Sequence, residues 1–322
     1  MEQLINIVLL FLLVMVAIAV IKQRNLFTIA MLTGIYSFLT AGLFMDLDAV
    51  DVAFTEAAVG AGVTTVLMLS ALRLVGSQQR PTRHPAIALL VVGVTGAALI
   101  YGTLDAPNFG DPNAPAHTHV APRYIEQGPV EVGMPNMVTA VLASYRGHDT
   151  LGETVVILTA GLAVLLLLGI QSGPEIQHNV SAMGRHMVLR VMVKLLLPFI
   201  LLFGLYVQMH GDFGAGGGFQ AGVIVATGFV LYDLVFGEGN LRKVLPTVWL
   251  TRIAAIGVLI YGGVGVFSLF AGHPFLDYSA LADDPVHGQH LGVLLVEAGV
   301  GLTVFSTVLI IFYAFSGRRR QQ

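Results

Sequence analysis

The chain contains no cysteine, and charged residues are scarce in it. Without thiols it cannot form disulfides, ligate iron–sulfur clusters or bind metals through thiolates, so any redox chemistry must belong to other chains. Charged residues make up 11% of the 322 positions, against about 25% in a typical soluble domain. Hydrophobic residues reach 56% and stand in long uninterrupted runs. These features predict a membrane protein.

Apolar runs of membrane-spanning length recur along the chain. A bilayer core needs about 20 apolar residues in a helix. The first run starts at Leu4 with no basic region before it, so we expect no cleavable signal peptide. The sequence predicts an all-α, polytopic bundle of about nine transmembrane helices: Leu4–Ile21, Leu26–Met45, Val52–Leu74, Ala86–Leu104, Leu151–Ile170, Met187–Met209, Phe219–Phe236, Val248–Phe270 and Leu291–Phe315.

Basic residues gather in alternate loops of this scheme. Cytoplasmic loops of membrane proteins are enriched in Lys and Arg. With nine spans, one side carries Lys22, Arg24, Arg73, Arg80, Arg83, Arg185, Arg242, Lys243, Arg318, Arg319 and Arg320. The other side carries only Arg123 and Arg146, beside acidic or neutral loops. The pattern predicts an external N-terminus and a cytoplasmic C-terminus.

The spans fall into three predicted blocks. Residues 1–78 hold three spans, residues 79–179 hold two spans around a long external loop, and residues 180–322 hold four. Within the second block, Met137–Tyr145 is too short to span, so we expect a lateral or re-entrant helix that starts after Pro135. No internal repeat is evident, which argues against a self-contained transporter built on inverted repeats.

Ionisable residues inside spans are costly and are functional candidates by default. Glu56 lies near the start of the third span, which Asp51 opens. It is either a helix-end carboxylate, which the helix dipole favours, or a protonatable group on an ion path. Small residues follow it, so another helix can approach closely. Glu297 lies less than two turns into the ninth predicted span, where the same two interpretations apply.

Glu153 stands at the outer start of the fifth predicted span. Thr150 and Glu153 have the spacing of a capping box, in which Thr150 would be the N-cap. The alternative is that Asp149 and Glu153 together attract cations.

Two cations and one carboxylate lie near the cytoplasmic ends of the sixth and seventh spans. Because a short loop joins these spans, we expect them to be antiparallel neighbours. Arg190 keeps a fixed charge, so it suits a structural pair with Asp233. Lys194 lies deeper and can change its protonation more readily, so we expect it on the transport path.

The segment His210-Gly-Asp-Phe-Gly-Ala-Gly-Gly-Gly-Phe219 joins the same two spans. It lacks the Gly-Lys-Ser/Thr of a phosphate loop, so we expect no nucleotide there. It is either a tight turn or a broken helix start whose amides and carbonyls lie near an ion path. In the second case His210, Gly216, Gly217, Gly218 and Phe219 are site candidates. The pair His117 and His119 is a weak metal signal, and we expect no metal or cofactor.

Three segments resemble parts of Mrp-type Na+/H+ antiporters. Asp51–Leu72 (DVAFTEAAVGAGVTTVLMLSAL) and Pro135–Glu153 (PNMVTAVLASYRGHDTLGE) are similar to the C-terminal part of the large A-type subunit. His210–Gly222 (HGDFGAGGGFQAG) resembles the signature of the MnhB-type family. The chain looks like a fusion of the two, with departures at Ala215, where Pro is usual, and at Asp212, where Asn or His is usual.

The resemblance implies a non-enzymatic subunit of a large cation/proton antiporter in a prokaryotic cell membrane. It implies roles in ion movement for Glu56 and Glu153, and a first block similar to the J-type subunit of complex I. The implied partners are large A-type and D-type pumping subunits, small C-, E-, F- and G-type subunits, lipid, Na+ and H+, without nucleic acid. Two alternatives stay open: the ion-translocating module of a redox-driven complex, and a structural scaffold.

Overall fold

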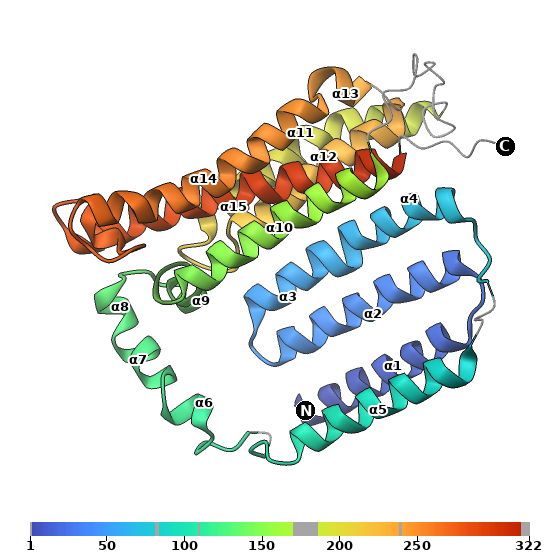
Figure 1. Ribbon diagram of the computed structural model, residues 1–322, viewed down its shortest axis with the longest axis horizontal. Coiled ribbons are helices and arrows are strands. Elements are labelled where there is room, and N and C mark those ends of the chain that lie inside the picture. Colours follow the sequence, from blue (N-terminus) through green and yellow to red (C-terminus); the bar gives the residue numbers. More distant parts are fainter. Residues whose placement is uncertain (1, 81–83, 109, 170–185, 238–239, 317–322) are drawn as a thin grey trace.

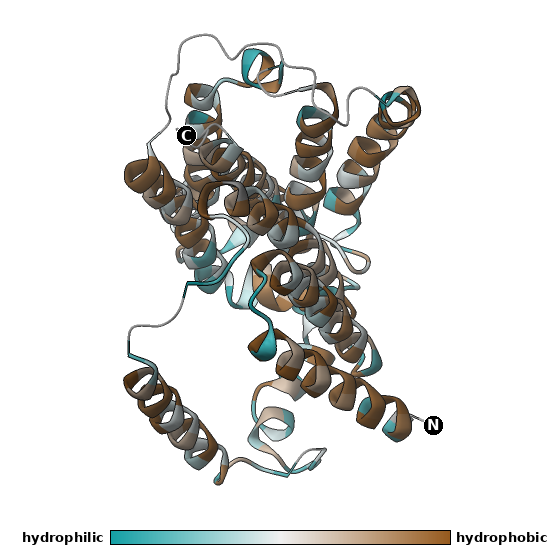
Figure 2. Ribbon diagram, turned by 90° about the vertical axis from the view of Figure 1, so that its right-hand side faces the viewer, coloured by the Kyte–Doolittle hydropathy of each residue, from teal (hydrophilic) through white to brown (hydrophobic). Residues whose placement is uncertain are grey.

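A computed structural model describes residues 2–80, 84–108, 110–169, 186–237 and 240–316. Over these ranges nine helical stretches are long and apolar enough to cross a membrane, and the chain forms no β-sheet there. Figure 2 shows that their residues are mostly hydrophobic and that hydrophilic residues gather in the connections. The prediction of an all-α, multi-pass membrane protein is therefore confirmed. The stretches are α1 (Glu2–Lys22), α2 (Leu26–Asp46), the third span of α3 (Val50–Glu56), η1 (Ala57–Thr64) and α4 (Thr65–Val75), then α5 (Pro85–Thr103), α10 (Gly147–Leu168), α11 (Met187–His210), α12 (Gly218–Phe236), α14 (Thr247–Phe270) and α15 (Pro285–Ser316).

Short helices occupy the connections. The predicted short helix exists with the expected bounds, as α9 (Met137–Thr139) followed by the π-helical η2 (Ala140–Tyr145). The side chain of Asn136, directly after Pro135, caps it by accepting a hydrogen bond from Val138 N at 2.9 Å. The remaining short helices are α6 (Pro115–Thr118), α7 (Ala121–Glu126), α8 (Gly128–Glu131), α13 (Asn240–Val244) and the 3-10 helix η4 (Tyr278–Leu281).

The helices form two groups (Figure 1). In the first, α2 packs against α1, α3 and η1. In the second, α15 is central and packs against α10, α12 and α14, while α11 packs on the outer side of α12. The third span joins the groups, because η1 contacts α12 and α4 contacts α15. No residue of α5 is buried.

Glycines bring the central helices together. A methyl group added to Gly257 of α14 would lie 2.4 Å from the carbonyl oxygen of Gly299 on α15. One added to Gly218 of α12 would lie 2.0 Å from the carbonyl oxygen of Glu297. Backbones this close leave no room for a side chain, which is typical of helix contacts in membranes.

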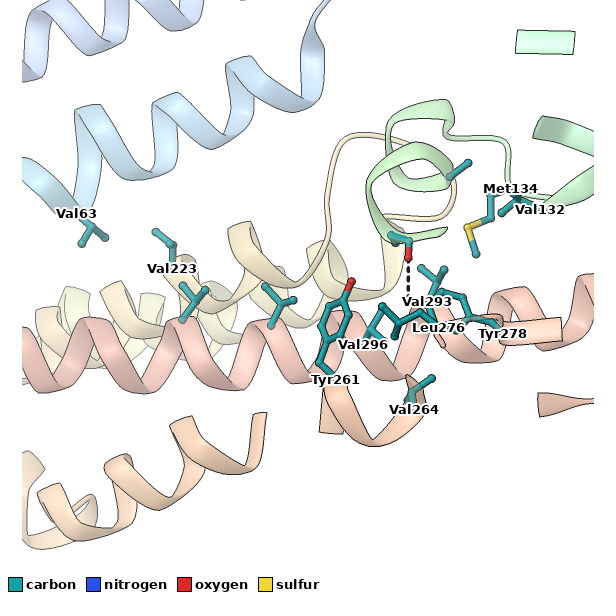
Figure 3. Packing of buried hydrophobic residues seen from close by; sticks show 14 residues of the cluster. Val63, Val132, Met134, Val223, Tyr261, Val264, Leu276, Tyr278, Val293 and Val296 are labelled. Carbon is teal, nitrogen blue, oxygen red and sulfur yellow. Dashed lines mark hydrogen bonds between the residues drawn. The ribbon is translucent and has the colours of Figure 1, made fainter. Parts of the chain in front are cut away.

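A buried cluster joins both groups near the functional site (Figure 3). Val63 of η1 and Val223 of α12 lie at one end, and Tyr261 of α14 and Val296 of α15 lie further along. Tyr278 of η4 is fully buried, and its hydroxyl donates to the carbonyl oxygen of Ala143 at 2.8 Å. This bond links η2 to η4, which packs against α15.

Two helices begin earlier than predicted. α10 begins at Gly147, four residues before Leu151, and α15 begins at Pro285, six residues before Leu291. Both extra stretches are polar enough to fall below the hydropathy of a span. Other predictions fall outside the described residues: the boundary between 179 and 180, and the orientation signals Arg83, Arg185, Arg318, Arg319 and Arg320.

Candidate functional site

Carboxylates from three different spans line one cavity of about 330 Å³. They are Asp51 of α3, Glu153 of α10 and Glu297 of α15. Gly216, Gly217, Gly218 and Phe219, at the start of α12, line it as well. Further polar groups come from Thr55, Thr139, Thr150, Thr154, Gln220 and Tyr261. The cavity therefore offers carboxylates, hydroxyls and an amide to a small polar species.

The glycine loop, residues 211–217, lines the cavity through Gly216 and Gly217. Side chains from other elements hold this loop in place. Asp51 accepts a hydrogen bond from the backbone N–H of Gly216, at 3.2 Å. Asn136 donates to the carbonyl oxygens of Gly211 and Gly214, at 3.0 and 2.8 Å. Thr139 also donates to the carbonyl of Gly211, at 2.7 Å. The loop is thus more than a tight turn between α11 and α12.

Glu297 places its carboxylate against this loop. A methyl group at Gly217 would lie 3.0 Å from its Oε1, and one at Gly211 would lie 3.0 Å from its Oε2. Gly217 also has a φ of +124°, which other residues rarely adopt. Glu297 is twelve residues beyond Pro285, or about 18 Å along the helix. It is therefore not a helix-start carboxylate, and its depth of less than two turns from Leu291 stays a prediction.

A polar bridge crosses from α12 to α3 beside the carboxylates. Gln220 is buried and donates to the hydroxyl of Thr55 at 2.8 Å. Thr55 donates in turn to the carbonyl of Asp51 at 2.9 Å. The sequence interpretation missed both residues, because neither is charged.

The π-helical segment η2 is fastened by hydroxyl groups along another wall. Thr150 donates to the carbonyl of Leu142 in η2 at 2.8 Å, and Tyr261 donates to the carbonyl of Gly147, the first residue of α10, at 2.9 Å. Thr150 therefore lies inside α10 and binds an earlier carbonyl. The capping-box interpretation of Thr150 and Glu153 is wrong, because α10 already begins at Gly147.

Asp149 and His210 lie outside the cavity lining. Asp149 is exposed and accepts a hydrogen bond from Nε of Arg146 at 2.7 Å. The imidazole of His210 stacks on Tyr206, with ring centroids 4.9 Å apart. Of the predicted pair Asp149 and Glu153, only Glu153 therefore lines the cavity.

Glu56 also lies away from the cavity. It is the last residue of α3, directly before η1, so it is not a helix-start carboxylate. Its carboxylate and the hydroxyl of Ser37 on α2 both lie against Gly60. Glu56 thus faces the contact between the second and third spans.

The predicted cation cluster lies on α11, apart from the cavity. Arg190 and Lys194 are both exposed, and their charged groups lie 5.9 and 5.7 Å from the ring centroid of Phe236. Asp233 is buried on α12. The structural pair of Arg190 with Asp233 and the transport role of Lys194 stay predictions.

No three His, Asp or Glu side chains of the described ranges are grouped so that they could hold a metal ion together. His117 and His119 are exposed.

This architecture defines a class: a multi-pass membrane protein whose spans surround a cavity lined by carboxylates. Three family models match it: a domain related to the MnhB subunit of Na+/H+ antiporters at residues 188–310, the D-type subunit of MBH at 11–77, and the E-type subunit of MBH at 79–175. The putative antiporter subunit mnhB2 of Staphylococcus aureus (strain Newman) is 32% identical over 135 residues, which are 41% of this chain and 95% of that relative. The chain belongs to the MnhB family of antiporter subunits.

Longer similarities cover almost the whole chain. The A/B-type subunit of a probable K(+)/H(+) antiporter of Rhizobium meliloti (strain 1021) is 28% identical over 90% of this chain. This chain spans only 32% of that relative's length. The Mrp complex from Dietzia sp. DQ12-45-1b matches 98% of this chain and 35% of its own, with a TM-score of 0.76 and 25% identity. The archaeal membrane-bound sulfane sulfur reductase matches 72% of this chain and 98% of its own, with a TM-score of 0.56 and 28% identity. These matches fit a fusion of A-type and B-type segments.

Proposed function

We propose that this chain is a membrane subunit of a multisubunit monovalent cation/proton antiporter, and that its cavity lies on the ion path. One observation carries the proposal: Asp51, Glu153 and Glu297 come from three separate spans and line the same cavity. Carboxylates inside membrane spans are expensive, and they mark proton and cation routes. The similarity to chains of antiporter complexes supports the same function.

In this proposal the chain conducts ions and supports assembly, with no covalent catalytic step of its own. Protons and Na+ or K+ compete for the carboxylates, so loading one species releases the other. Hydroxyl and amide groups such as Thr55 and Gln220 replace part of the water around a passing cation. The chain works beside other antiporter subunits, because it spans only about a third of the A/B-type relative.

The test is an antiport assay on membrane vesicles that contain the whole complex. Glu297→Gln removes the charge and keeps the shape, so it should lower Na+- or K+-driven proton movement severalfold while the complex still assembles. The matched control is Glu126→Gln, because Glu126 is exposed on α7, outside the cavity. An assembled Glu297→Gln complex with wild-type exchange would instead favour a structural scaffold.

A second candidate function is supported by the similarity to the sulfane sulfur reductase complex. In that case the same cavity would belong to the ion-translocating module of a redox-driven assembly, and partner chains would carry out the electron transfer. The two functions differ in their energy source. Ion movement that requires an added electron donor, together with co-purifying redox subunits, would favour the second.

A further inference from the structure

His290 and Asp212 form a pair at the edge of the glycine loop. Nδ1 of His290 lies 3.3 Å from Oδ2 of Asp212, and the two side chains are 35% and 20% exposed. The other ring nitrogen, Nε2, faces Gly133, where an added methyl group would lie 3.7 Å from it. The imidazole is therefore fixed between the loop and the segment before α9, with partial access to solvent.

His290 stands outside the apolar core of the membrane. The 32 residues of α15 extend about 48 Å, and a bilayer core is about 30 Å thick. His290 is only five residues after the first residue of α15. It is also seven residues, or two helical turns, before Glu297, so the two side chains share one face of the helix. A charge on His290 therefore lies two turns nearer the start of α15 than Glu297, on the face of the helix that lines the cavity.

Asp212 connects this pair to the cavity. Its backbone carbonyl accepts a hydrogen bond from the backbone N–H of Asn136 at 3.0 Å, and Asn136 also holds Gly211 and Gly214. The carboxylates of Asp212 and Asp51 are both close enough to Glu297 to interact with it electrostatically. Three acidic groups thus share one corner of the molecule, and a positive imidazole would offset one of them.

The other titratable groups on the elements packed here are His210 at the end of α11, Tyr261 of α14, Tyr278 of η4, Tyr145 of η2, Glu153 of α10 and Glu297 itself. Hydrogen bonds from Tyr145 and Arg123 hold the pKa of Glu131 below its usual value. Burial, with Glu131 as neighbour, raises the pKa of Tyr145 to about 12, and burial also raises that of Tyr278. Glu131, Tyr145 and Tyr278 therefore keep their charge state near neutrality, whereas an imidazole changes charge there.

We propose that His290 is a positioning residue that sets the cation affinity of the cavity according to pH, through its pair with Asp212. When His290 is protonated, it neutralises Asp212, and the cavity attracts cations less strongly. When it is neutral, the negative charge of Asp212 is no longer offset, and the cavity attracts cations more strongly. The inference rests on the proposed function of the cavity.

The test compares two variants with opposite fixed charge. His290→Gln remains neutral and His290→Arg remains positive at every pH. Purified complex in proteoliposomes is assayed for Na+-driven proton movement at a series of Na+ concentrations, with the same starting pH on both sides, across about pH 5 to 8, where imidazole titrates. His287→Gln is the matched control, because His287 is exposed one turn earlier on the same helix.

Protons also compete directly with Na+ at the carboxylates, so every variant retains some pH dependence. Relative to wild type, His290→Gln should lower the apparent Na+ constant severalfold at the acid end only. His290→Arg should raise it severalfold at the alkaline end only. Asp212→Asn keeps the shape of the pair without the carboxylate charge, so it should raise the apparent Na+ constant above that of wild type at both ends of the pH range, and it serves as the test if His290→Arg fails to assemble.

Profiles of these variants that superimpose on the wild-type and His287→Gln profiles would overturn the inference about His290. That outcome leaves antiport by the cavity intact. A wild-type complex that shows no Na+- or K+-driven proton movement would overturn the proposed function itself, so the two failures are distinguishable.

Discussion

Glu56 differs from the cavity carboxylates in its surroundings. It lies at the point where α3 passes into the π-helical η1, against Gly60 and beside Ser37 of α2. Because the site is part of a helix contact, a proton bound there would change the charge between the second and third spans. Glu56→Gln should lower antiport severalfold in complex that assembles normally. The control is Asp48→Asn, because Asp48 is exposed and Asn tolerates its φ of 58°.

The measurement is the rate of cation-driven proton movement, normalised to the amount of assembled complex. Wild-type exchange in Glu56→Gln, with wild-type assembly, would assign Glu56 to helix packing alone.

Single residues of the cavity could be predicted from the sequence where they were charged inside an apolar run or belonged to the run of glycines from Gly216 to Gly218. Asp51, Glu153 and Glu297 met the first condition, but the sequence did not show that they share a cavity, because 246 positions separate Asp51 from Glu297. Gln220 and Thr55 gave no signal, since uncharged polar residues are common in spans. Asn136 could have been recognised as a cap directly after Pro135.

At the scale of elements, the contact between α12 and α15 depends on glycine. A methyl group at Gly218 would lie 2.0 Å from the carbonyl oxygen of Glu297, so Gly218→Ala must push the helices apart. We expect a destabilisation of about 1–3 kcal/mol, as for an overpacked core. The control is Gly262→Ala on α14, where an added methyl group meets nothing within 4 Å. The thermal stability of the purified complex is measured for both variants. Equal stability of Gly218→Ala and Gly262→Ala would contradict the packing argument.

Hydropathy located the spans, because lipid demands long apolar helices whatever the tertiary packing. It misplaced the start of α15, since residues from Pro285 to His290 are polar and extend beyond the apolar core. It gave no sign that η1 and η2 are π-helical, because that geometry depends on packing. In η2 hydroxyls of Tyr278 and Thr150 bind the carbonyls of Ala143 and Leu142.

At the scale of the whole molecule, backbone contacts place the connections after the first and third spans at the same end. Leu26 N donates to Ser77 O at 2.8 Å, and Gln79 N donates to Arg24 O at 2.9 Å. At the end of α15, Arg242 of α13 donates to the carbonyl of Tyr313 at 2.7 Å. Figure 1 shows these connections at one end, with α6 to α8 at the other.

The charges at the two ends predict which one is cytoplasmic. The first end carries Lys22 at the end of α1, Arg24 and Arg80 in the paired connections, and Arg242 and Lys243 on α13. At the opposite end, Arg123 pairs with Glu131 at 3.0 Å, and Arg146 pairs with Asp149. Those two arginines are therefore largely neutralised, and the positive charge lies at the first end. Since cytoplasmic loops retain Lys and Arg, we expect that end to face the cytoplasm.

The absence of cysteine gives this prediction a clean test. Ser77→Cys adds a thiol at the expected cytoplasmic end, and Asn113→Cys adds one in the expected external loop; both positions are exposed. An impermeant maleimide applied to intact cells should label Asn113→Cys and leave Ser77→Cys unlabelled until the cells are permeabilised. The opposite pattern would reverse the orientation. It would also put His290 and the glycine loop on the cytoplasmic side, so that cytoplasmic pH would act on the pair of His290 and Asp212.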